Sequence, residues 1–391
     1  MQLANVREHN LSTLLKVLAA AETPLSRAEL AQATSLTKPT VSRLVDDLLS
    51  AGLLAEQAPA RTGTGGRPGT PVALAAASVV ALGALVSADH VAVDLVDLRQ
   101  EVVATASVPV THPPTPRDAV VLLADLAREL LTAHAHDAVA GLVVSVPGRL
   151  SPDGQRVRSA PNLGWDDAPL VELLEAAPGL AGIAVTLEND ARLAAETEAV
   201  ARLRDGARDF VLVYGETGIG GAVVSEGEVL RGRHGWAGEI GHLCLDADGP
   251  ECRCGRRGCL EAYASYWALA RESGHAGGIG EYFEALAGAE RRAVVERIGT
   301  RLGLALSQVL NIVDLPLVVL GGYFRPLAAE LTPFLEAELA ARALAAEAGD
   351  IEVDATAAPA EPSLLGAGLR AIQPVFDDPA AWIRNAQALR G

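Results

Sequence analysis

The chain of 391 residues contains only two lysines, Lys16 and Lys38, and its four cysteines all lie between positions 244 and 259. The strong preference for arginine over lysine reflects genomic base composition, so the abundance of arginine alone carries no functional meaning. Four cysteines within one short segment exclude a disulfide framework spread over the fold. They favour a metal site in a reducing compartment instead.

The sequence also lacks the signals of secretion and membrane insertion. The first ten residues have no apolar run behind a basic segment, so we expect no secretory signal peptide. The uncharged stretch 68–88 is long enough for a membrane helix. It contains Gly69, Pro71 and Gly83, however, and its bulky residues are β-branched, which favours a linker followed by a buried strand. We therefore expect a cytoplasmic protein that does not contact a membrane.

Half of the residues are hydrophobic, which excludes a disordered chain, and the length suggests two or three folding units. The net charge of −17 is unevenly distributed. Residues 1–75 carry seven basic and six acidic side chains, whereas the remaining 316 residues carry a net charge of about −18. Because the larger part would repel a polyanion, any contact with nucleic acid is expected near the N-terminus.

Residues 1–75 have the pattern of three short helices. Leucines at positions 11, 14, 15 and 18 follow the spacing of an amphipathic helix. Ser26 and Glu29 form a capping box that begins a second helix, and Thr37 can cap a third, which ends before Gly52. Two short apolar segments then flank a glycine-rich basic tip. This order predicts a winged helix-turn-helix; the alternative is a small helical module for protein interactions followed by a flexible linker.

The start of the third helix presents polar side chains suited to the major groove of DNA, namely Lys38, Thr40, Ser42 and Arg43. Arginine can bind guanine or phosphate, and hydroxyl groups can bind either. Arg61 and Arg67 lie on the tip of the predicted wing, where arginine is suited to a narrow minor groove.

From about residue 79 the pattern changes to strands that alternate with helices. We expect strands at 79–87, 91–97, 102–108, 139–146, 183–187, 210–214 and 317–320, and helices at 117–133, 191–201 and 364–372. The last helix is expected to pack back on the first lobe. This alternation predicts an α/β protein with two lobes, in which ligands bind in the crevice beyond the carboxyl ends of the strands.

One histidine and three of the cysteines have the spacing of a closed zinc site, namely His242, Cys252, Cys254 and Cys259. Three thiolates and an imidazole fill all four tetrahedral positions, so the zinc would be structural rather than catalytic. Cys244 is expected in the core, although it could replace His242 as the fourth ligand. Buried free thiols without a metal are the alternative.

Three further segments carry groups that could bind a ligand. The zinc loop would bring Glu239, His242 and Glu261 together, and such groups are suited to paired hydroxyls, although a solvated face is the alternative. The polar triplet 188–190 lies where a strand ends and a helix begins, so it could bind a ligand or merely cap the helix. The glycine-rich hairpin 215–221 could hold phosphate through its amides, but a plain tight turn is the more common use of such a sequence.

Taken together, these segments resemble the ROK family of repressors and sugar kinases. The resemblance covers nearly the whole chain and rests on residues 188–190, 218–221, 237–242 and 252–261, with a similar substrate loop at 161–165. The preceding winged helix-turn-helix is similar to the repressor branch. The resemblance implies a hexokinase/actin-like fold with a DNA-binding domain at 1–75, a first lobe at 76–190, a second lobe with the zinc loop at 191–362, and a C-terminal helix at about 363–391 that packs back on the first lobe.

The resemblance also implies a sugar in the cleft, bound by Asn162, Asn189, Asp190, Glu239, His242 and Glu261. The position of Asp190 is that of the general base in the kinases, which would be vestigial here. His242 would both ligate zinc and face the sugar, so that the metal preorganises the pocket.

The sequence departs from the kinases at the family's first phosphate loop, which reads Asp-x-Gly-Gly-Thr. The aligned positions here are Leu85, Ser87, Ala88 and Asp89. Leucine cannot help to hold Mg²⁺, and Asp89 would repel a triphosphate, so we expect no kinase activity.

These features predict a sugar-responsive transcriptional regulator, in the first instance a repressor of carbohydrate-utilisation genes. We expect a homodimer or a dimer of dimers that binds an imperfect palindromic operator. Two alternatives come from other classes: an ATP-dependent ROK sugar kinase with an appended DNA-binding domain, and a DNA-binding dimer whose pocket holds no sugar.

Overall fold

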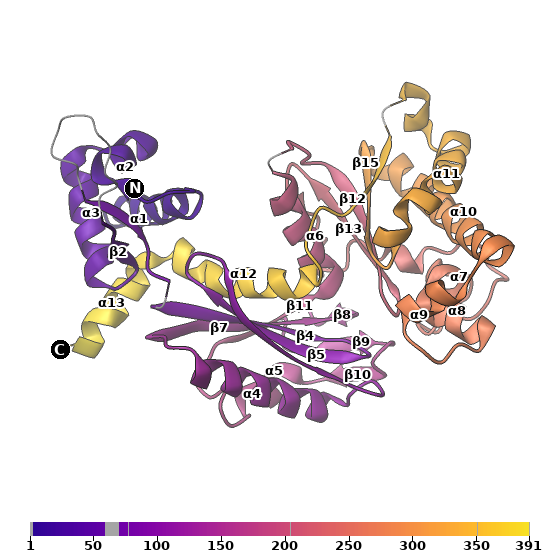
Figure 1. Cartoon of the computed structure of the whole chain (residues 1–391), viewed down its shortest axis with the longest axis horizontal. Coiled ribbons are helices and arrows are strands. Elements are labelled where there is room, and N and C mark those ends of the chain that lie inside the picture. Colours follow the sequence, from indigo (N-terminus) through magenta and orange to yellow (C-terminus); the bar gives the residue numbers. More distant parts are fainter. Residues whose placement is uncertain (1–2, 59–69, 77, 204, 350, 391) are drawn as a thin grey trace.

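The computed structural model describes residues 3–58, 70–76, 78–203, 205–349 and 351–390. Three parts follow one another along the molecule: a small head that contains the N-terminus, a first lobe and a second lobe (Figure 1). Each lobe is built around a five-stranded sheet. Within the described ranges, none of the helices is long and apolar enough to cross a membrane.

The head is a winged helix-turn-helix, as the sequence predicts. Its elements are α1 (Leu3–Ala19), β1 (Leu25–Ser26), α2 (Arg27–Thr34), α3 (Lys38–Ser50), β2 (Leu54–Glu56) and β3 (Pro71–Leu74). The capping box of Ser26 and Glu29 is present, and the Thr37 side chain caps α3. The strands form an antiparallel sheet in the order β1-β3-β2. The wing tip with Arg61 and Arg67 lies outside the described residues.

The first lobe contains a mixed sheet in the order β11-β7-β4-β5-β6. Its strands are β4 (Val79–Val86), β5 (His90–Asp97), β6 (Val102–Pro109), β7 (Ala138–Val146) and β11 (Val185–Asn189). Helices α4 (Pro116–Ala133) and α5 (Leu170–Glu175) cover one face, and α12 (Pro362–Asp377) covers the other (Figure 1). The backbone of α12 comes so close to β4 that a Cβ atom on Gly83 would overlap with Gly368.

A second, smaller sheet lies beside the carboxyl ends of these strands. It consists of β8 (Arg149–Leu150), β9 (Val157–Ala160) and β10 (Trp165–Ala168), paired antiparallel. These strands are not predicted from the sequence, because each is shorter than the windows in which alternation can be recognised. The loop between β9 and β10 carries Asn162 toward the space between the lobes.

The second lobe contains a sheet in the order β14-β13-β12-β15-β16. Its strands are β12 (Phe210–Gly215), β13 (Ile219–Ser225), β14 (Glu228–Val229), β15 (Leu317–Gly322) and β16 (Glu352–Ala355). Helix α6 (Asp190–Arg202) packs on one face of the sheet. The other face is covered by α10 (Gly288–Val313) and α11 (Phe324–Arg342). Beside them lie three shorter helices, α7 (Glu261–Ala264), α8 (Tyr266–Ser273) and α9 (Ile279–Ala285). The lobe also contains the short helices η1 (Ile240–His242) and η2 (Leu344–Ala348).

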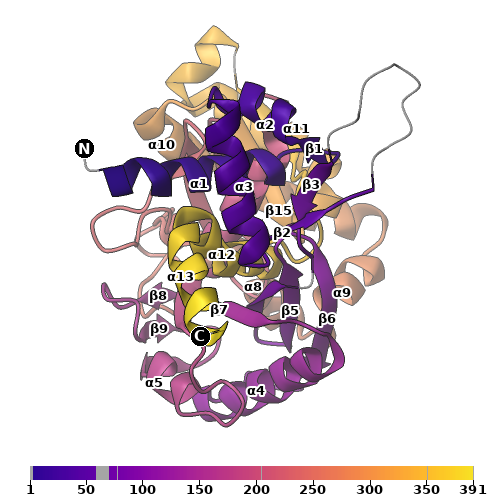
Figure 2. The same cartoon turned by 90° about the vertical axis from the view of Figure 1, so that its left-hand side faces the viewer.

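Helix α12 connects the parts of the molecule. It packs against α6 at one end and against α1 at the other, and α13 (Pro379–Arg390) continues along the head beside α1 and α3 (Figure 2). One apolar core joins Leu11 and Leu15 of the head to Val375 and Phe376 of α12. Burial of this continuous apolar surface favours a fixed position of the head on the first lobe.

Candidate functional site

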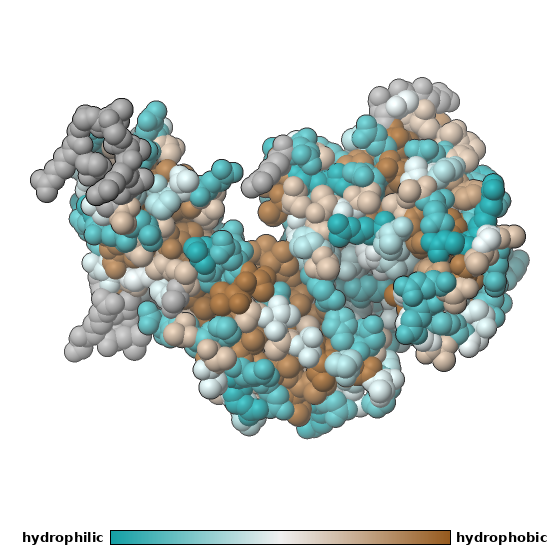
Figure 3. Space-filling view, in the orientation of Figure 1, coloured by the Kyte–Doolittle hydropathy of each residue, from teal (hydrophilic) through white to brown (hydrophobic). Residues whose placement is uncertain are grey.

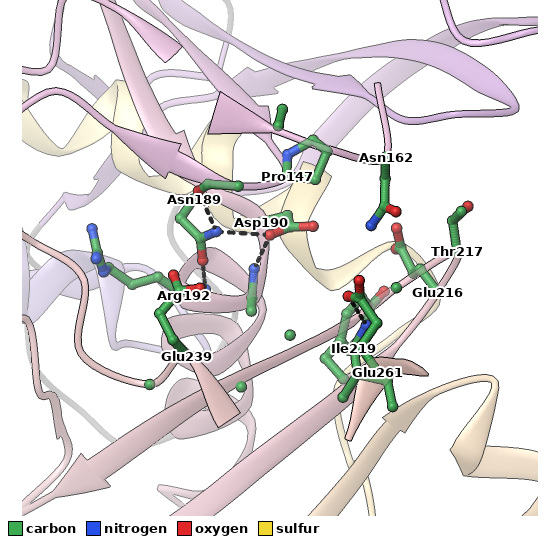
Figure 4. A pocket seen from close by; sticks show the side chains of 18 of the residues that line it. Pro147, Asn162, Asn189, Asp190, Arg192, Glu216, Thr217, Ile219, Glu239 and Glu261 are labelled. Carbon is green, nitrogen blue, oxygen red and sulfur yellow. Dashed lines mark hydrogen bonds between the residues drawn. The ribbon is translucent and has the colours of Figure 1, made fainter. Parts of the chain in front are cut away.

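A cleft with about 860 Å³ of empty space, including open solvent at its mouth, lies between the two lobes. Its walls come from the ends of β7 and β11, the β9–β10 loop, the β12–β13 hairpin and the segment before the zinc loop (Figure 4). All six side chains that the family resemblance implies for sugar binding line this one cleft, namely Asn162, Asn189, Asp190, Glu239, His242 and Glu261. The structure therefore brings together residues that are up to 99 positions apart in the sequence.

Asn189 and Asp190 lie where β11 passes into α6. The Asn189 side chain accepts a hydrogen bond from the backbone N–H of Arg192 at 3.0 Å, so this residue does cap the helix while it lines the cleft. Its Nδ2 donates to Asp190 Oδ1 at 3.0 Å, and the backbone N–H of Ala191 donates to the same oxygen at 2.7 Å. Burial, together with repulsion by the Glu239 and Glu261 carboxylates, raises the pKa of Asp190 to about 7.

The opposite wall is built around the predicted zinc loop. Glu261 Oε2 accepts a hydrogen bond from the backbone N–H of Ile219 at 3.0 Å, which ties α7 to the β12–β13 hairpin. Glu239 Oε2 lies 3.7 Å from His242 Nε2. Burial raises the pKa of Glu239. Asn162 accepts a hydrogen bond from the Arg253 guanidinium at 3.2 Å, so the cleft is bridged by a contact between its lobes.

The four predicted metal ligands form a compact group. The ligand atoms of His242, Cys252, Cys254 and Cys259 all lie within 4.8 Å of one another, and they are the only such group of three or more among the described residues. Cys252 Sγ lies 3.8 Å from His242 Nδ1, and Cys254 Sγ lies 3.8 Å from Cys259 Sγ. This donor set fits a tetrahedral metal ion. Burial raises the pKa of Cys252 and Cys259, so a bound cation would be needed to hold both as thiolates.

The expectation that Cys244 belongs to the core is wrong. Cys244 is exposed, lies outside the group of metal ligands, and faces the carbonyl oxygen of Arg257 at 3.6 Å. It forms an isolated β-bridge with Cys259, whose own side chain is buried in the metal group. Spacing alone could not show on which side of this bridge the thiol would lie.

The structure adds Glu216 to the cleft, at the turn between β12 and β13 (Figure 4). Burial raises the pKa of Glu216 to about 8, and repulsion by Asp190 contributes to the increase. From the sequence, this segment was expected to be a plain tight turn, with phosphate binding as the less common alternative. One signal in the sequence could have identified this residue. A carboxylate within a glycine-rich hairpin would repel phosphate, which argues against a phosphate loop.

The segment aligned with the first phosphate loop of the kinases is occupied by the protein's own ion pairs. Leu85 is buried against Ala92 and Leu364, away from the cleft. His90 Nδ1 lies 2.8 Å from Asp89 Oδ1, and His90 Nε2 lies 3.2 Å from Glu361 Oε2 at the start of α12. The two carboxylates raise the pKa of His90 to about 10, and the pKa of Asp89 is lowered to about 2.

A second candidate surface lies at the start of α3. The side chains of Lys38 and Arg43 are exposed, and neither forms a hydrogen bond or ion pair within the described residues. The other cations described in the head are paired with carboxylates: Arg7 with Asp47 at 2.9 Å, Lys16 with Asp377 at 2.9 Å and Arg27 with Asp46 at 2.8 Å. The Thr40 hydroxyl lies 2.9 Å from that of Thr37, within the helix cap, and Ser42 is half-buried.

Comparisons with known proteins find two families along the chain. The sequence profile of the ROK family matches residues 82–371, and that of the MarR family matches residues 12–63. The xylose repressor of Bacillus subtilis (strain 168) is 31% identical over 268 residues, which make up 68% of this chain and 67% of the repressor. A glucokinase of Halalkalibacterium halodurans is 31% identical over 225 residues, 51% of this chain and 67% of the kinase.

The fold is also found among solved structures. A ROK family transcriptional regulator, described as a homologue of the E. coli MLC protein, aligns with a TM-score of 0.76 and 22% identity over 97% of this chain and 99% of its own. The shared fold includes both the head and the two lobes.

Proposed function

The chain belongs to the ROK family, and from this premise we propose that it is a sugar-responsive repressor of carbohydrate-utilisation genes. The operator would be bound by the head, and a sugar in the cleft would alter that binding. The observation that carries the proposal is the connection between a cleft lined by the six sugar-binding positions and a winged head with two unpaired cations on α3, through the single helix α12. The similarity to a xylose repressor supports the same function.

Operator DNA would be contacted in two ways. Lys38 and Arg43 on α3 would enter the major groove, with Thr40 and Ser42 beside them, and Arg61 and Arg67 on the wing would contact the minor groove. A homodimer, or a dimer of dimers, would place two heads on the half-sites of an imperfect palindrome, in the cytoplasm. The pairing of Arg7, Lys16 and Arg27 with carboxylates supports this assignment, because it leaves the free positive charge of the described head on α3.

A structural zinc ion would be held by His242, Cys252, Cys254 and Cys259. The ion would supply a fixed tetrahedral link and no chemistry of its own. His242 would use Nδ1 on the metal side, where Cys252 lies, and present Nε2 to Glu239 and the cleft. The zinc loop also leads directly into α7, whose first residue is Glu261. Metal binding would in this way position three of the six sugar-binding side chains.

A second candidate function, an ATP-dependent sugar kinase, is favoured by Asp190, which occupies the position of the catalytic base, and by the glucokinase relative. Three features oppose it. Leu85 is directed into the core, His90 pairs Asp89 of the phosphate loop with Glu361 at the start of α12, and Glu216 adds a carboxylate to the cleft. Phosphoryl transfer requires neutralisation of the triphosphate, so these carboxylates support a regulator that does not phosphorylate its ligand.

The route from the cleft to the head would begin at Glu188, the buried residue directly before Asn189 and Asp190. Its carboxylate is bound by three arginines from different elements: Arg192 of α6, Arg231 after β14 at 3.4 Å, and Arg370 of α12 at 3.1 Å. The Arg370 guanidinium also binds Glu196 of α6 at 2.6 Å. This ion network joins both lobes and α12, next to the residues that would bind sugar.

The other end of α12 contacts the head directly. Asp377 pairs with Lys16 of α1, two turns of helix beyond Arg370, and Phe376 is buried in the core shared with the head. Closure of the lobes on a sugar would therefore displace α12 and change the separation of the two heads in a dimer. A complete shift from the bound to the released state requires a difference of about 5.5 kcal/mol in ligand binding between the two states.

The test is a thermal-shift screen of the full chain against mono- and disaccharides, with and without MgATP. The proposal predicts that at least one sugar raises the melting temperature and that MgATP adds nothing. Formation of ADP that depends on a sugar and disappears in Asp190→Asn would contradict the repressor without kinase activity and support the sugar kinase. If no sugar stabilises the protein, the cleft is not a sugar site and the sugar-responsive function is wrong.

A further inference from the structure

A tryptophan of the second lobe contacts the first lobe beside the cleft. Trp236 lies in the loop 231–238, between β14 and η1, and its neighbours on both sides line the cleft. Its indole Nε1 donates a hydrogen bond to the backbone carbonyl oxygen of Leu150 in β8 at 2.9 Å. The guanidinium carbon of Arg149 lies 5.3 Å from the centroid of the indole ring. Trp236 thus makes both a polar and a cation–π contact with one short strand of the first lobe.

The loop that carries Trp236 is fixed to the second lobe. The backbone N–H of Ala237 donates to the carbonyl oxygen of Arg231 at 3.2 Å, which closes the loop on itself. Gly238 lies so close to β13 that a Cβ atom there would overlap with the carbonyl oxygen of Gly221. Its φ of 91° also lies in the region that favours glycine. The Trp236 ring therefore moves together with the second lobe.

The partner residues of Trp236 are fixed to the first lobe. Arg149 and Leu150 form β8, which pairs antiparallel with β9, and the Leu150 side chain packs on the core of the first lobe. Gly148, directly before them, approaches Ser159 so closely that any side chain there would overlap with the backbone of β9. The contacts of Trp236 consequently exist only while the two lobes are close together.

Closure of the lobes is favoured by the chemistry of this contact. Trp236 is 37% exposed, so separation of the lobes would expose still more of a large apolar ring. It would also remove the protein acceptor of the indole N–H and separate the Arg149 charge from the ring. Burial raises the pKa of the cleft carboxylate Glu239, and His242 and Arg149 counteract that rise, so the Arg149 charge also acts on the wall of the cleft.

The same loop is connected to the ion network that leads to α12. Gly235, the residue directly before Trp236, accepts a hydrogen bond on its carbonyl oxygen from Arg192. Arg192 also donates to Glu188, the carboxylate to which Arg370 of α12 binds at 3.1 Å. A displacement of the Trp236 ring therefore reaches this network through a single peptide unit.

We propose that Trp236 is a positioning residue that holds the two lobes closed on a ligand and conveys their closure to the Glu188 network. The ring docks on β8 when the lobes come together, and the Gly235 carbonyl then fixes Arg192 against Glu188. Trp236 itself does not touch the ligand. This inference rests on the proposed function, because it names the residue through which a bound sugar keeps the regulatory cleft closed.

The first test is isothermal titration calorimetry of the full chain with three probes, glucose, xylose and N-acetylglucosamine. For a probe that binds, we expect Trp236→Ala to weaken binding about tenfold, the order of one hydrogen bond and one exposed cation–π contact together. Trp236→Phe, which keeps a ring but loses the N–H, and Arg149→Gln should each weaken it about threefold. Arg158→Gln is the matched control, because that guanidinium pairs with Asp167 within the first lobe at 2.7 Å, and should bind like the wild type.

The second test separates a role in closure from a general structural role. In the Trp236→Ala background, Arg149→Gln should cause no further loss of affinity, because the two side chains act through one contact. The probe sugar should also change the tryptophan fluorescence as the ring docks. Most of this change should be lost in Trp236→Phe and retained in Trp382→Phe, whose ring lies on α13 and packs on the core of the head.

The results distinguish the inference from the proposed function. Wild-type affinity in both Trp236 variants, or losses from Trp236→Ala and Arg149→Gln that simply add, overturns the inference and leaves the sugar-responsive function intact. A fluorescence change that persists in Trp236→Phe overturns it as well. If none of the three probes, nor any sugar of the wider panel, binds the unmodified chain, the proposed function and the inference both fail. Trp236→Phe and Arg149→Gln keep the test valid even if Trp236→Ala does not fold.

Discussion

At the scale of single residues, charges are paired in opposite ways in the head and in the cleft. The described cations of the head are mostly bound by carboxylates, and only Lys38 and Arg43 remain for an external partner. In the cleft, Arg192 binds Glu188 and the carbonyl oxygen of Gly235, His242 belongs to the metal group, and four carboxylates line the same space. These two patterns suit a polyanion at the head and a polyhydroxylated ligand in the cleft.

Arg43→Ala should weaken operator binding by about 1–3 kcal/mol and relax the sequence preference if the side chain contacts a base. Arg27→Ala is the control, because that guanidinium already pairs with Asp46 and should contribute less. Fluorescence anisotropy with operator DNA and with base-substituted operators measures both effects. An unchanged affinity and an unchanged footprint for Arg43→Ala would remove this residue from the interface.

Cys254→Ser should release the bound metal and lower the melting temperature, because three ligands hold zinc less tightly than four. Cys244→Ser provides a matched control, since that thiol is exposed and lies outside the metal group. Metal content by mass spectrometry and melting by circular dichroism give the two readouts. Equal metal content in the two variants would contradict the assigned ligand set.

His90→Gln should destabilise the protein in a pH-dependent way. The pKa of His90 is raised from 6.5 to about 10, so its stabilising effect is complete below pH 6.5 and is lost as the pH rises through 10. The pKa of Asp89 is lowered from 3.8 to about 2, so its effect is present above pH 3.8 and is lost as the pH falls through 2. The difference in stability between wild type and variant should therefore be largest between about pH 4 and 6.5.

Both partners of His90 are substantially exposed, so the maximum difference should be only about 1 kcal/mol. Thermal melts of both proteins at pH 5, 7 and 9 are sufficient to follow it. A difference that grows toward pH 9 would show that His90 is not held in its charged form.

At the scale of elements, helix α12 connects the cleft to the head. It carries Gly368 against β4, Arg370 into the ion network of Glu188, and Phe376 into the core of the head. The valley between the head and the second lobe lies over this helix, and Figure 3 shows that its floor is hydrophobic. The head touches α12 and α13, so a displacement of α12 is transmitted to the head by packing.

Arg370→Gln should uncouple the sugar from the operator. We expect operator affinity without sugar and sugar affinity without DNA to change less than about threefold. The fold-change that sugar causes in operator affinity should be mostly lost. Arg342→Gln is the control, because the one ion pair of that side chain among the described residues is with Glu338 of its own helix. Anisotropy titrations with and without sugar measure the coupling. Full coupling in Arg370→Gln would show that the signal takes another route.

The elements that could be predicted from the sequence are those with local signals. The caps at Ser26 and Thr37 are set by contacts three residues apart, and both are present. The cleft residues were assigned through the family resemblance, and the structure places them together. Contacts such as Arg370 with Glu196, which lie 174 positions apart, have no local signal. The place of Glu216 in the cleft depends on how the two lobes pack, and the exposure of Cys244 depends on the side of a β-bridge.

At the scale of the whole molecule, the fold separates the two activities and joins them through one core. The head has a net charge near zero by sequence, while the rest of the chain is strongly acidic, so DNA would be repelled from the lobes and held at the head. The continuous apolar core from α1 to α12 opposes independent motion of the head. Two states of the lobes would thus give two positions of the head relative to a second copy of the chain.

The most direct test of the central claim is the operator affinity of the full chain with and without a sugar that the cleft binds. We expect saturating sugar to change this affinity by about five- to 150-fold, the range of ordinary allosteric coupling, and Arg370→Gln to reduce the change. An operator affinity that is the same with and without bound sugar would contradict the claim that the cleft regulates the head.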